Sequence, residues 1–282
     1  MLAIAPRQLT IVTATLICLP APVQAQSATP WHADSHAAVR LIAGSMVKSA
    51  GATFVRAGIE IKLEPGWKTY WRDPGDSGVP PTFDFTGSEN VKAATVLWPA
   101  PERFADGAGG HSIGYMGHII LPLRIVPEEA ARASALHLKL DYAICGTLCM
   151  PAEARLDLAL TGTGTEEVAL EQAELLVPKR VALGAGTRLA IRSVHREASG
   201  AHERVVVEVA APEGAPVDLY VEGPTSEWAL PLPEPDGSTT APTRRFTFEL
   251  DGLPSGAQGK GATLTFTAVS GDDAIEVPAR LD

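Results

Sequence analysis

The residues of this chain best suited to do chemistry are two cysteines separated by three residues, in Cys145-Gly-Thr-Leu-Cys149. The third cysteine, Cys18, lies in an N-terminal segment with the features of an export signal. A disulfide needs its two Cα atoms within about 7 Å, whereas residues four apart on a flat strand lie roughly 13 Å apart. If the pair bonds, we therefore expect the chain to turn between a strand ending near Tyr142 and one starting near Arg155.

Three functions are open to such a pair: thiol–disulfide exchange, an inert structural clasp, and metal binding. The clasp is the weaker explanation, because closing so small a ring contributes only about 2 kcal/mol. The chain is 45% hydrophobic and can build a core without it. The neighbouring Met150 adds a soft ligand suited to Cu(I). Zinc would need further ligands, and no zinc-site spacing is found among His111, His118 and His137.

The N-terminus indicates the redox compartment. Arg7 precedes an apolar run from Leu9 to Leu19, and Val23-Gln24-Ala25 has the small-x-small pattern of a signal peptidase site. We predict that residues 1–25 are a signal peptide, cleaved after Ala25, and that the protein is periplasmic. No run of 18 apolar residues follows, so we predict no transmembrane segment in the mature chain.

The charge balance excludes one class of partner. The chain has 23 Lys and Arg against 33 Asp and Glu, a net charge of −10, and its basic residues are not clustered. Such a surface repels nucleic acid and anionic lipid, so we expect no nucleic-acid binding.

Short runs of alternating or β-branched residues, separated by Gly and Pro, predict strands throughout the chain. They are 52–63, 91–98, 118–126, 136–142, 155–160, 188–194, 203–209, 217–221, 245–250 and 262–269. A helix is predicted over 165–177, with Thr165 as N-cap and Pro178 as its stop. We predict an all-β fold of two immunoglobulin-like antiparallel β-sandwich domains joined by a short helix. The expected boundaries are 31–163 for the first sandwich, 164–180 for the helical linker and 181–282 for the second.

One motif suggests a different chemistry. Gly110-His111-Ser112-Ile113-Gly114 matches the G-x-S-x-G pattern of serine hydrolases, which requires a strand–turn–helix to expose the serine. Glycines precede this motif and a strand pattern follows it, so we expect a mobile glycine-rich loop and no hydrolase site.

Four strings of residues together resemble a known family: Gly66-Trp-Lys-Thr-Tyr-Trp-Arg-Asp-Pro-Gly-Asp-Ser-Gly-Val-Pro-Pro81, Trp98-Pro-Ala-Pro-Glu-Arg-Phe104, Gly114-Tyr-Met-Gly117 and Tyr142-x-x-Cys145-x3-Cys149-x-Pro151. They resemble the N-terminal periplasmic domain of DsbD-type thiol:disulfide reductases, most closely the ScsB branch linked to copper tolerance. The similarity is dense from about Ala37 to Leu160.

The resemblance implies an immunoglobulin-like domain that carries electrons. A membrane-embedded thiol reductase, a thioredoxin-like domain or both would reduce it, and it would reduce periplasmic thioredoxin-like clients, including those of cytochrome c biogenesis. By resemblance, Cys149 forms the mixed disulfide and Cys145 resolves it. The segment from Phe104 to Tyr115 corresponds to a cap loop over the pair. Four aromatic residues are expected around the cap and the active loop: Phe104, Tyr115, Tyr142 and Trp71. Core packing is the alternative for the last three.

The chain departs from the family in two respects. It ends at Asp282 without the family's membrane and thioredoxin domains, and it contains no Cys-x-x-Cys, so we expect its electrons to come from a separate protein. Its cysteine spacing is also shorter than in the better-known branch. We therefore predict an exchange carrier of the protein-disulfide reductase type, without a cofactor. The alternatives are a Cu(I)-binding copper-tolerance protein and an immunoglobulin-like interaction module with an inert disulfide.

Overall fold

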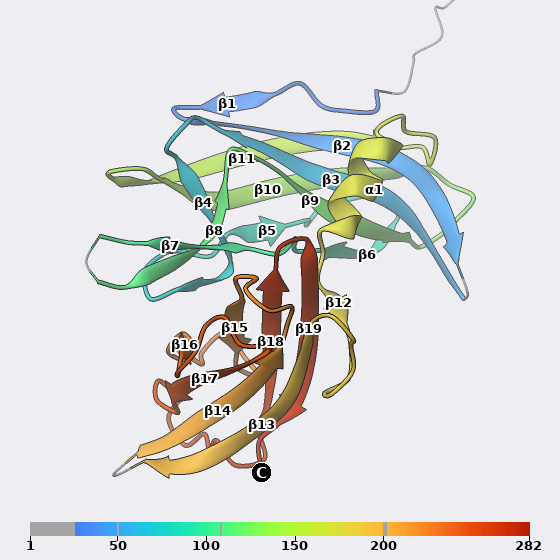
Figure 1. The fold of residues 1–282 in the computed structure, drawn as a ribbon. Coiled ribbons are helices and arrows are strands. Elements are labelled where there is room, and N and C mark those ends of the chain that lie inside the picture. Colours follow the sequence, from blue (N-terminus) through green and yellow to red (C-terminus); the bar gives the residue numbers. More distant parts are fainter. Residues whose placement is uncertain (1–25, 50, 108, 200–201) are drawn as a thin grey trace, which may run out of the picture.

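A computed structural model of the chain describes residues 26–49, 51–107, 109–199 and 202–282. The predicted signal peptide, 1–25, lies outside these residues. Within them the regular structure consists of strands and one short helix, α1 (Glu167–Leu175), as Figure 1 shows. The prediction of an all-β fold is confirmed.

The strands form four sheets, and every pairing except that of β12 with β19 is antiparallel. The first sheet has the order β1 (His32–Asp34), β2 (Ala37–Ser49), β3 (Ala52–Leu63), β9 (His118–Pro127) and β6 (Val91–Val96). The second has the order β11 (Cys149–Leu160), β10 (Ser134–Cys145), β4 (Lys68–Gly75), β8 (His111–Met116) and β7 (Glu102–Ala105), and β5 (Thr82–Asp84) also pairs with β10.

The other two sheets lie below these in the view of Figure 1. The third has the order β12 (Lys179–Arg180), β19 (Asp273–Arg280), β18 (Thr263–Ser270) and β15 (Asp218–Glu222). The fourth has the order β13 (Ala190–Ser199), β14 (His202–Ala210), β17 (Thr243–Glu249) and β16 (Glu234–Pro235). Strand β19 follows a tight turn after β18, and the sequence patterns did not predict it.

Period-two alternation determines which face of each strand is buried. In β10, Leu136, Leu138 and Leu140 are at most 3% exposed, while the residues between them are half-buried. These leucines belong to a hydrophobic cluster between the first two sheets, and a second cluster lies between the last two. Tyr220 of β15 and Leu232, just before β16, join the first cluster, so the C-terminal part of the chain is in apolar contact with the first two sheets.

Arg72 of β4 connects the two groups of sheets by ion pairs. Its guanidinium donates to both carboxylate oxygens of Glu222, at 2.8 and 2.6 Å, and to Glu276 at 2.7 Å. Side-chain exposures are 27% for Arg72, 20% for Glu222 and 17% for Glu276. The bidentate geometry and partial burial make this contact stronger than an ordinary surface pair.

Replacing Arg72 by methionine is expected to lower the free energy of unfolding by about 2 kcal/mol, since Glu222 loses its cation and Glu276 keeps only the exposed Arg180, at 3.5 Å. Urea unfolding followed by circular dichroism measures the change. Glu222→Gln and Glu276→Gln added to Arg72→Met should recover part of the loss. Unchanged unfolding of the single variant would show that these ion pairs do not stabilise the contact.

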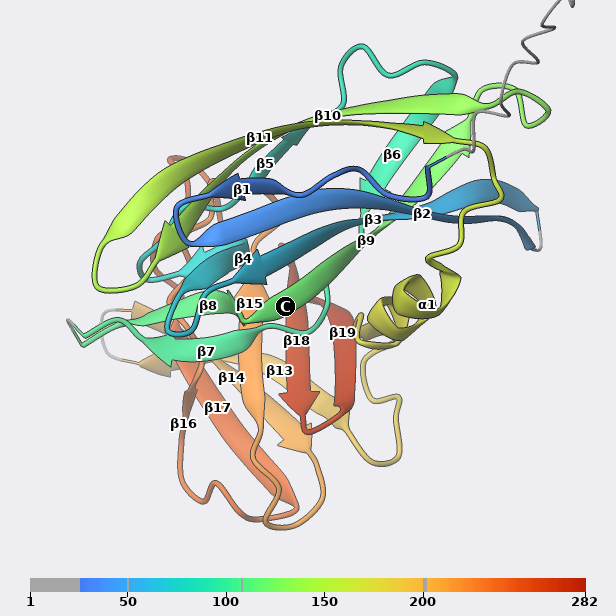
Figure 2. The same cartoon turned by 90° about the horizontal axis from the view of Figure 1, so that it is seen from above.

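Helix α1 packs against the first sheet, beside β2, β3 and β9 (Figure 2). Leu170 is fully buried over Gly58, where a Cβ atom would lie 2.7 Å from its methyl group. The predicted N-cap, Thr165, is wrong: Glu166 holds that position, without a side-chain cap. Tertiary contacts stabilise this end of the helix instead, because Glu167 accepts hydrogen bonds from the backbone N–H of Ser45 and from Arg56.

The segment expected to be a mobile glycine-rich loop contains β8, an inner strand between β4 and β7. Ser112 is 1% exposed within it and accepts a hydrogen bond from Lys68 Nζ at 2.7 Å. This buried serine lies on a strand and not on a strand–turn–helix, in agreement with the expectation that it is no hydrolase nucleophile. Gly114 allows the close approach of β4, since a Cβ atom there would overlap the carbonyl oxygen of Thr69.

Among the described residues, no helix is both long enough and apolar enough to cross a bilayer.

Candidate functional site

The two cysteines close the tip of the β10–β11 hairpin. They are paired directly opposite each other, form a disulfide, and have Cα atoms 4.1 Å apart. Residues 146–148 make the turn, with a hydrogen bond from Gly146 N–H to the Leu148 carbonyl at 3.0 Å. The expected turn is present, but it is shorter than the sequence suggested. The ladder continues past Tyr142 and Arg155 to the cysteines themselves.

The two cysteines differ in accessibility. Cys145 is 1% exposed and lies in a small buried cluster with Tyr70 and Ala143, whereas Cys149 is an exposed residue. Leu148 beside it is 74% exposed. Strand β11 is the edge strand of its sheet, so an approaching protein reaches Cys149 first.

Tyr70 is the side chain in contact with both sulfurs. Its hydroxyl lies 2.9 Å from Cys145 Sγ and 3.3 Å from Cys149 Sγ, and the residue is 4% exposed. Burial raises the pKa of Tyr70, so the hydroxyl stays protonated near neutral pH. It can therefore donate a hydrogen bond to whichever sulfur becomes a thiolate.

A lysine and an aromatic ring lie next to this contact. Lys68 is paired opposite Cys145 in the sheet, which places the two side chains on one face. Its ammonium group is held by Ser112 and lies 5.5 Å from the centre of the Phe104 ring. The β7–β8 hairpin that carries Phe104 ends on the same side of the molecule as the cysteine turn in both Figure 1 and Figure 2.

The cysteine turn also packs on an aromatic pair. A Cβ atom at Gly146 would lie 3.2 Å from the Trp67 ring, so this position accommodates a side chain only if the ring shifts. His36 stacks on Trp67, with ring centroids 3.9 Å apart and an interplanar angle of 10°, and its Nδ1 lies 2.7 Å from Glu64. This stack limits the positions open to the turn.

Three of the four predicted aromatic site residues, Trp71, Tyr115 and Tyr142, are part of the hydrophobic core. Trp71 is fully buried and packs against Tyr220 at 5.8 Å between ring centroids. Tyr115 is 4% exposed and donates to the Pro99 carbonyl at 2.8 Å, and burial raises its pKa well above the usual value. Neither side chain forms a hydrogen bond with the sulfurs. The hydroxyl of Tyr70, which is next to Trp71 on the opposite face of β4, lies within hydrogen-bond distance of both.

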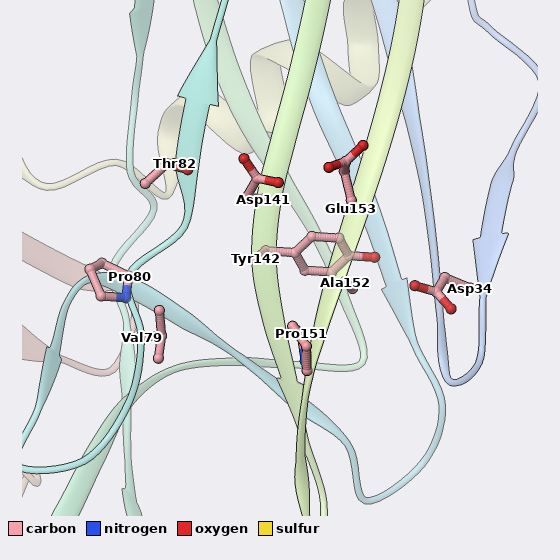
Figure 3. Close-up of a pocket in the computed structure, with 9 residues that line it drawn as sticks. All are labelled: Asp34, Val79, Pro80, Thr82, Asp141, Tyr142, Pro151, Ala152 and Glu153. Carbon is pink, nitrogen blue, oxygen red and sulfur yellow. The ribbon is translucent and has the colours of Figure 1, made fainter.

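Tyr142 is also buried, at 4% exposure, but it lines a pocket at the base of the cysteine hairpin. Burial, with the nearby charge of Asp34, raises the pKa of Tyr142 to about 12. Its hydroxyl is buried and has no hydrogen-bond partner among the residues that the structure describes. Figure 3 shows the ring lying across the hairpin, from β10 toward β11, with this hydroxyl directed toward Asp34.

The sequence analysis missed Tyr70 and Lys68 as site residues, although both lie in one of the strings that carry the family resemblance. The available signal was the period of two in Lys68-Thr-Tyr-Trp. It places Lys68 and Tyr70 on one face of β4 and Trp71 on the other. Only the pairing of β4 with β10 shows that the first of these faces meets the cysteines.

The described part of the chain contains no group of three or more His, Cys, Asp or Glu side chains arranged to hold a metal ion. Met150 follows Cys149 in β11, so its side chain points to the opposite face of the strand and packs against the hydrophobic core. Its thioether therefore does not extend a soft ligand set at the cysteines.

The geometry so far defines an antiparallel β protein with an accessible disulfide at a hairpin tip. Residues 40–161 match the family model described as thiol:disulfide interchange protein DsbD, N-terminal. This segment, which contains the whole cysteine site, is a domain of that family, as its sequence motifs predicted.

Among solved structures, the chain is similar to the N-terminal periplasmic domain of ScsB from Proteus mirabilis. The two are 23% identical, the match covers 91% of this chain and 99% of that chain, and the TM-score is 0.70. The fold extends over both groups of sheets. The YadV chaperone also matches, at 14% identity over 80% of this chain and 92% of that one, but its TM-score of 0.20 is too low to support a shared fold. No curated protein sequence matches the chain.

Proposed function

We propose that this chain is a periplasmic thiol–disulfide exchange module that relays two electrons through Cys145 and Cys149. It takes them from a membrane-embedded thiol reductase or a thioredoxin-like domain and gives them to periplasmic thioredoxin-like clients. The observation that carries the proposal is the disulfide at an exposed hairpin tip, with one cysteine accessible and the other buried. The family of residues 40–161 and the fold shared with a periplasmic domain support the location and the class of partner.

Reduction of the module begins at Cys149. A donor thiolate attacks the exposed Cys149 sulfur, the Cys145–Cys149 bond breaks, and Cys145 leaves as a thiolate. The Tyr70 hydroxyl, 2.9 Å from the Cys145 sulfur, donates a hydrogen bond to this leaving group. The donor's second thiolate then attacks the donor sulfur of the mixed disulfide and releases Cys149.

Oxidation by a client reverses these steps. The Cys149 thiolate attacks one sulfur of the client disulfide, and the other client sulfur leaves as a thiolate and takes up a proton. The Cys145 thiolate then attacks the Cys149 sulfur, expels the client and re-forms the Cys145–Cys149 bond. Two electrons have passed from the module to the client.

The remaining assignments belong to the same proposal. The segment from Phe104 to Tyr115 acts as the cap, with Phe104 over the side of the site that carries Lys68. Residues 31–163 and 181–282 are two sandwich domains and 164–180 links them. Their largely separate hydrophobic clusters support this division.

Trapping of the mixed disulfide tests the function. The reduced mature chain, residues 26–282, which lacks Cys18, should with Cys145→Ser form a stable covalent complex with an oxidised thioredoxin-like protein, because no second thiol releases it. Cys149→Ser should form none, since the remaining thiol is buried. Non-reducing electrophoresis and mass spectrometry measure the complex. Equal trapping by both variants would contradict the assigned roles, and trapping by neither would remove the proposed exchange.

A further inference from the structure

A pocket of about 480 Å³ lies at the base of the cysteine hairpin. It is formed by β10 and β11, the end of β1, and the segment that leads from β4 into β5 (Figure 3). Its apolar surface includes Pro151 and Val79, and Val79 is 60% exposed. A volume of this size accommodates a long side chain.

Two polar groups in this pocket lack the partners that their chemistry requires. The Tyr142 hydroxyl is buried and has no hydrogen-bond partner within the described ranges. Asp34 accepts a hydrogen bond from the Ser35 hydroxyl at 3.2 Å, but no basic side chain of the described residues lies within ion-pair distance of it. A buried hydroxyl without a partner is destabilising, and a ligand that donates to it would remove this cost.

The other charges at the pocket balance one another. Asp141 and Glu153 also line it, and Lys139 lies 2.9 Å from the first and 3.4 Å from the second. Glu153 is further paired with Arg155 at 2.9 Å. These two carboxylates therefore have cations of their own, and Asp34 retains an uncompensated charge. An anionic ligand would be repelled here, whereas a cation would be attracted.

The pocket lies within reach of a protein bonded to Cys149. The side chains of Cys149, Pro151 and Glu153 all point to the exposed face of β11, because these residues are two positions apart along the strand. Pro151 and Ala152 line the pocket two and three residues beyond Cys149, which is roughly 7–10 Å along the strand. When a cysteine of a partner protein is bonded to the Cys149 sulfur, the partner residues two to four positions from that cysteine lie at about this distance from the disulfide.

We propose that this pocket binds a basic side chain, arginine or lysine, of the protein that forms the mixed disulfide with Cys149. The proposal rests on the proposed function and adds to it a specificity-determining site. The cationic group donates to the Asp34 carboxylate and to the Tyr142 hydroxyl oxygen, and its aliphatic stem packs on Pro151 and Val79. The site thus selects partners with a basic residue beside the reacting cysteine.

Activated peptides test the selection. The probes are short Ala/Ser peptides with blocked ends and one cysteine carried as a mixed disulfide with 2-nitro-5-thiobenzoate. Arginine, or its neutral isostere citrulline, is placed two, three or four residues from that cysteine, on either side. The reduced mature chain, residues 26–282, with Cys145→Ser carries Cys149 as its one thiol; this thiol displaces nitrothiobenzoate from the peptide, and the release is followed by absorbance. We expect the arginine peptide to react about tenfold faster at low salt at one or more positions.

Asp34→Asn in the same background should bring the arginine-to-citrulline ratio close to one, and Tyr142→Phe, which keeps the ring in the core, should lower it. Using the ratio within each variant removes differences in thiol reactivity. Asp272→Asn, which removes the same charge at an exposed turn in the C-terminal part, should keep the full ratio. A ratio of one at every position, or a ratio that Asp34→Asn and Tyr142→Phe leave unchanged, overturns the proposal that the pocket binds a basic side chain. Release with no peptide at all would instead contradict the proposed exchange.

Discussion

Replacing Tyr70 by phenylalanine is expected to slow the reduction of the Cys145–Cys149 disulfide by dithiothreitol about three- to tenfold near neutral pH. A hydrogen bond to a charged group stabilises it by about 1.5–3 kcal/mol. Roughly half of such a change in leaving-group stability reaches the rate of thiol–disulfide exchange. The Tyr70 hydroxyl, 2.9 Å from the Cys145 sulfur, supplies that bond. Quenching with acid and mass spectrometry at successive times measures the rate.

The pH dependence separates this effect from a general loosening of the site. Because the Tyr70 hydroxyl stabilises a thiolate, its loss raises the pKa of the thiol that it contacts. The rise of alkylation rate with pH in the reduced protein should therefore move to higher pH in Tyr70→Phe. Tyr220→Phe is the matched control: its hydroxyl donates to the Pro101 carbonyl and not to a sulfur. Equal slowing in both variants would show that Tyr70 acts only by packing.

Replacing Gly114 by alanine is expected to lower the free energy of unfolding by about 3 kcal/mol, because the new methyl group overlaps the Thr69 carbonyl oxygen. A change of this size corresponds to a melting temperature lower by about 6–12 °C in a chain of this length. Gly114 is paired directly opposite Tyr70, so the strand that must move carries the side chain at the sulfurs. In the fraction of Gly114→Ala that remains folded, the Cys145–Cys149 disulfide should also be reduced more slowly. Calorimetry and the reduction assay measure the two effects.

Gly117→Ala gives the comparison for this prediction. Gly117 has a φ of +67° and open space where its Cβ atom would lie, so alanine there costs only about 1 kcal/mol in backbone strain. If Gly114→Ala were no more destabilising than Gly117→Ala, the close approach of β4 and β8 would not require glycine at position 114.

Local patterns predicted several of the strands whose two faces differ, although β19, which also alternates, was missed. Period two in β3, β9, β10 and β11 marks their buried face. The sequence placed the first three to within three residues but put the start of β11 six residues too late. It did not place β4 or β8, where glycines and prolines interrupt the pattern and the neighbouring strands satisfy the backbone. Helix α1 was predicted from composition, but Glu167, Ser45 and Arg56 determine where it begins.

The sequence by itself determined that this is an all-β protein with one close cysteine pair, and that residues 40–161 match the DsbD N-terminal family. Alternation, turn residues and motif order are properties of neighbouring positions along the chain. The tertiary structure decided which cysteine is exposed, that Tyr70 and not Trp71 contacts the sulfurs, and that Tyr142 and Asp34 share a pocket. Each of these depends on strands far apart in sequence: β4 meets β10 at Lys68 and Cys145, and the end of β1 lies near β10 and β11. Such pairings are set by the packing of whole sheets, which no local pattern specifies.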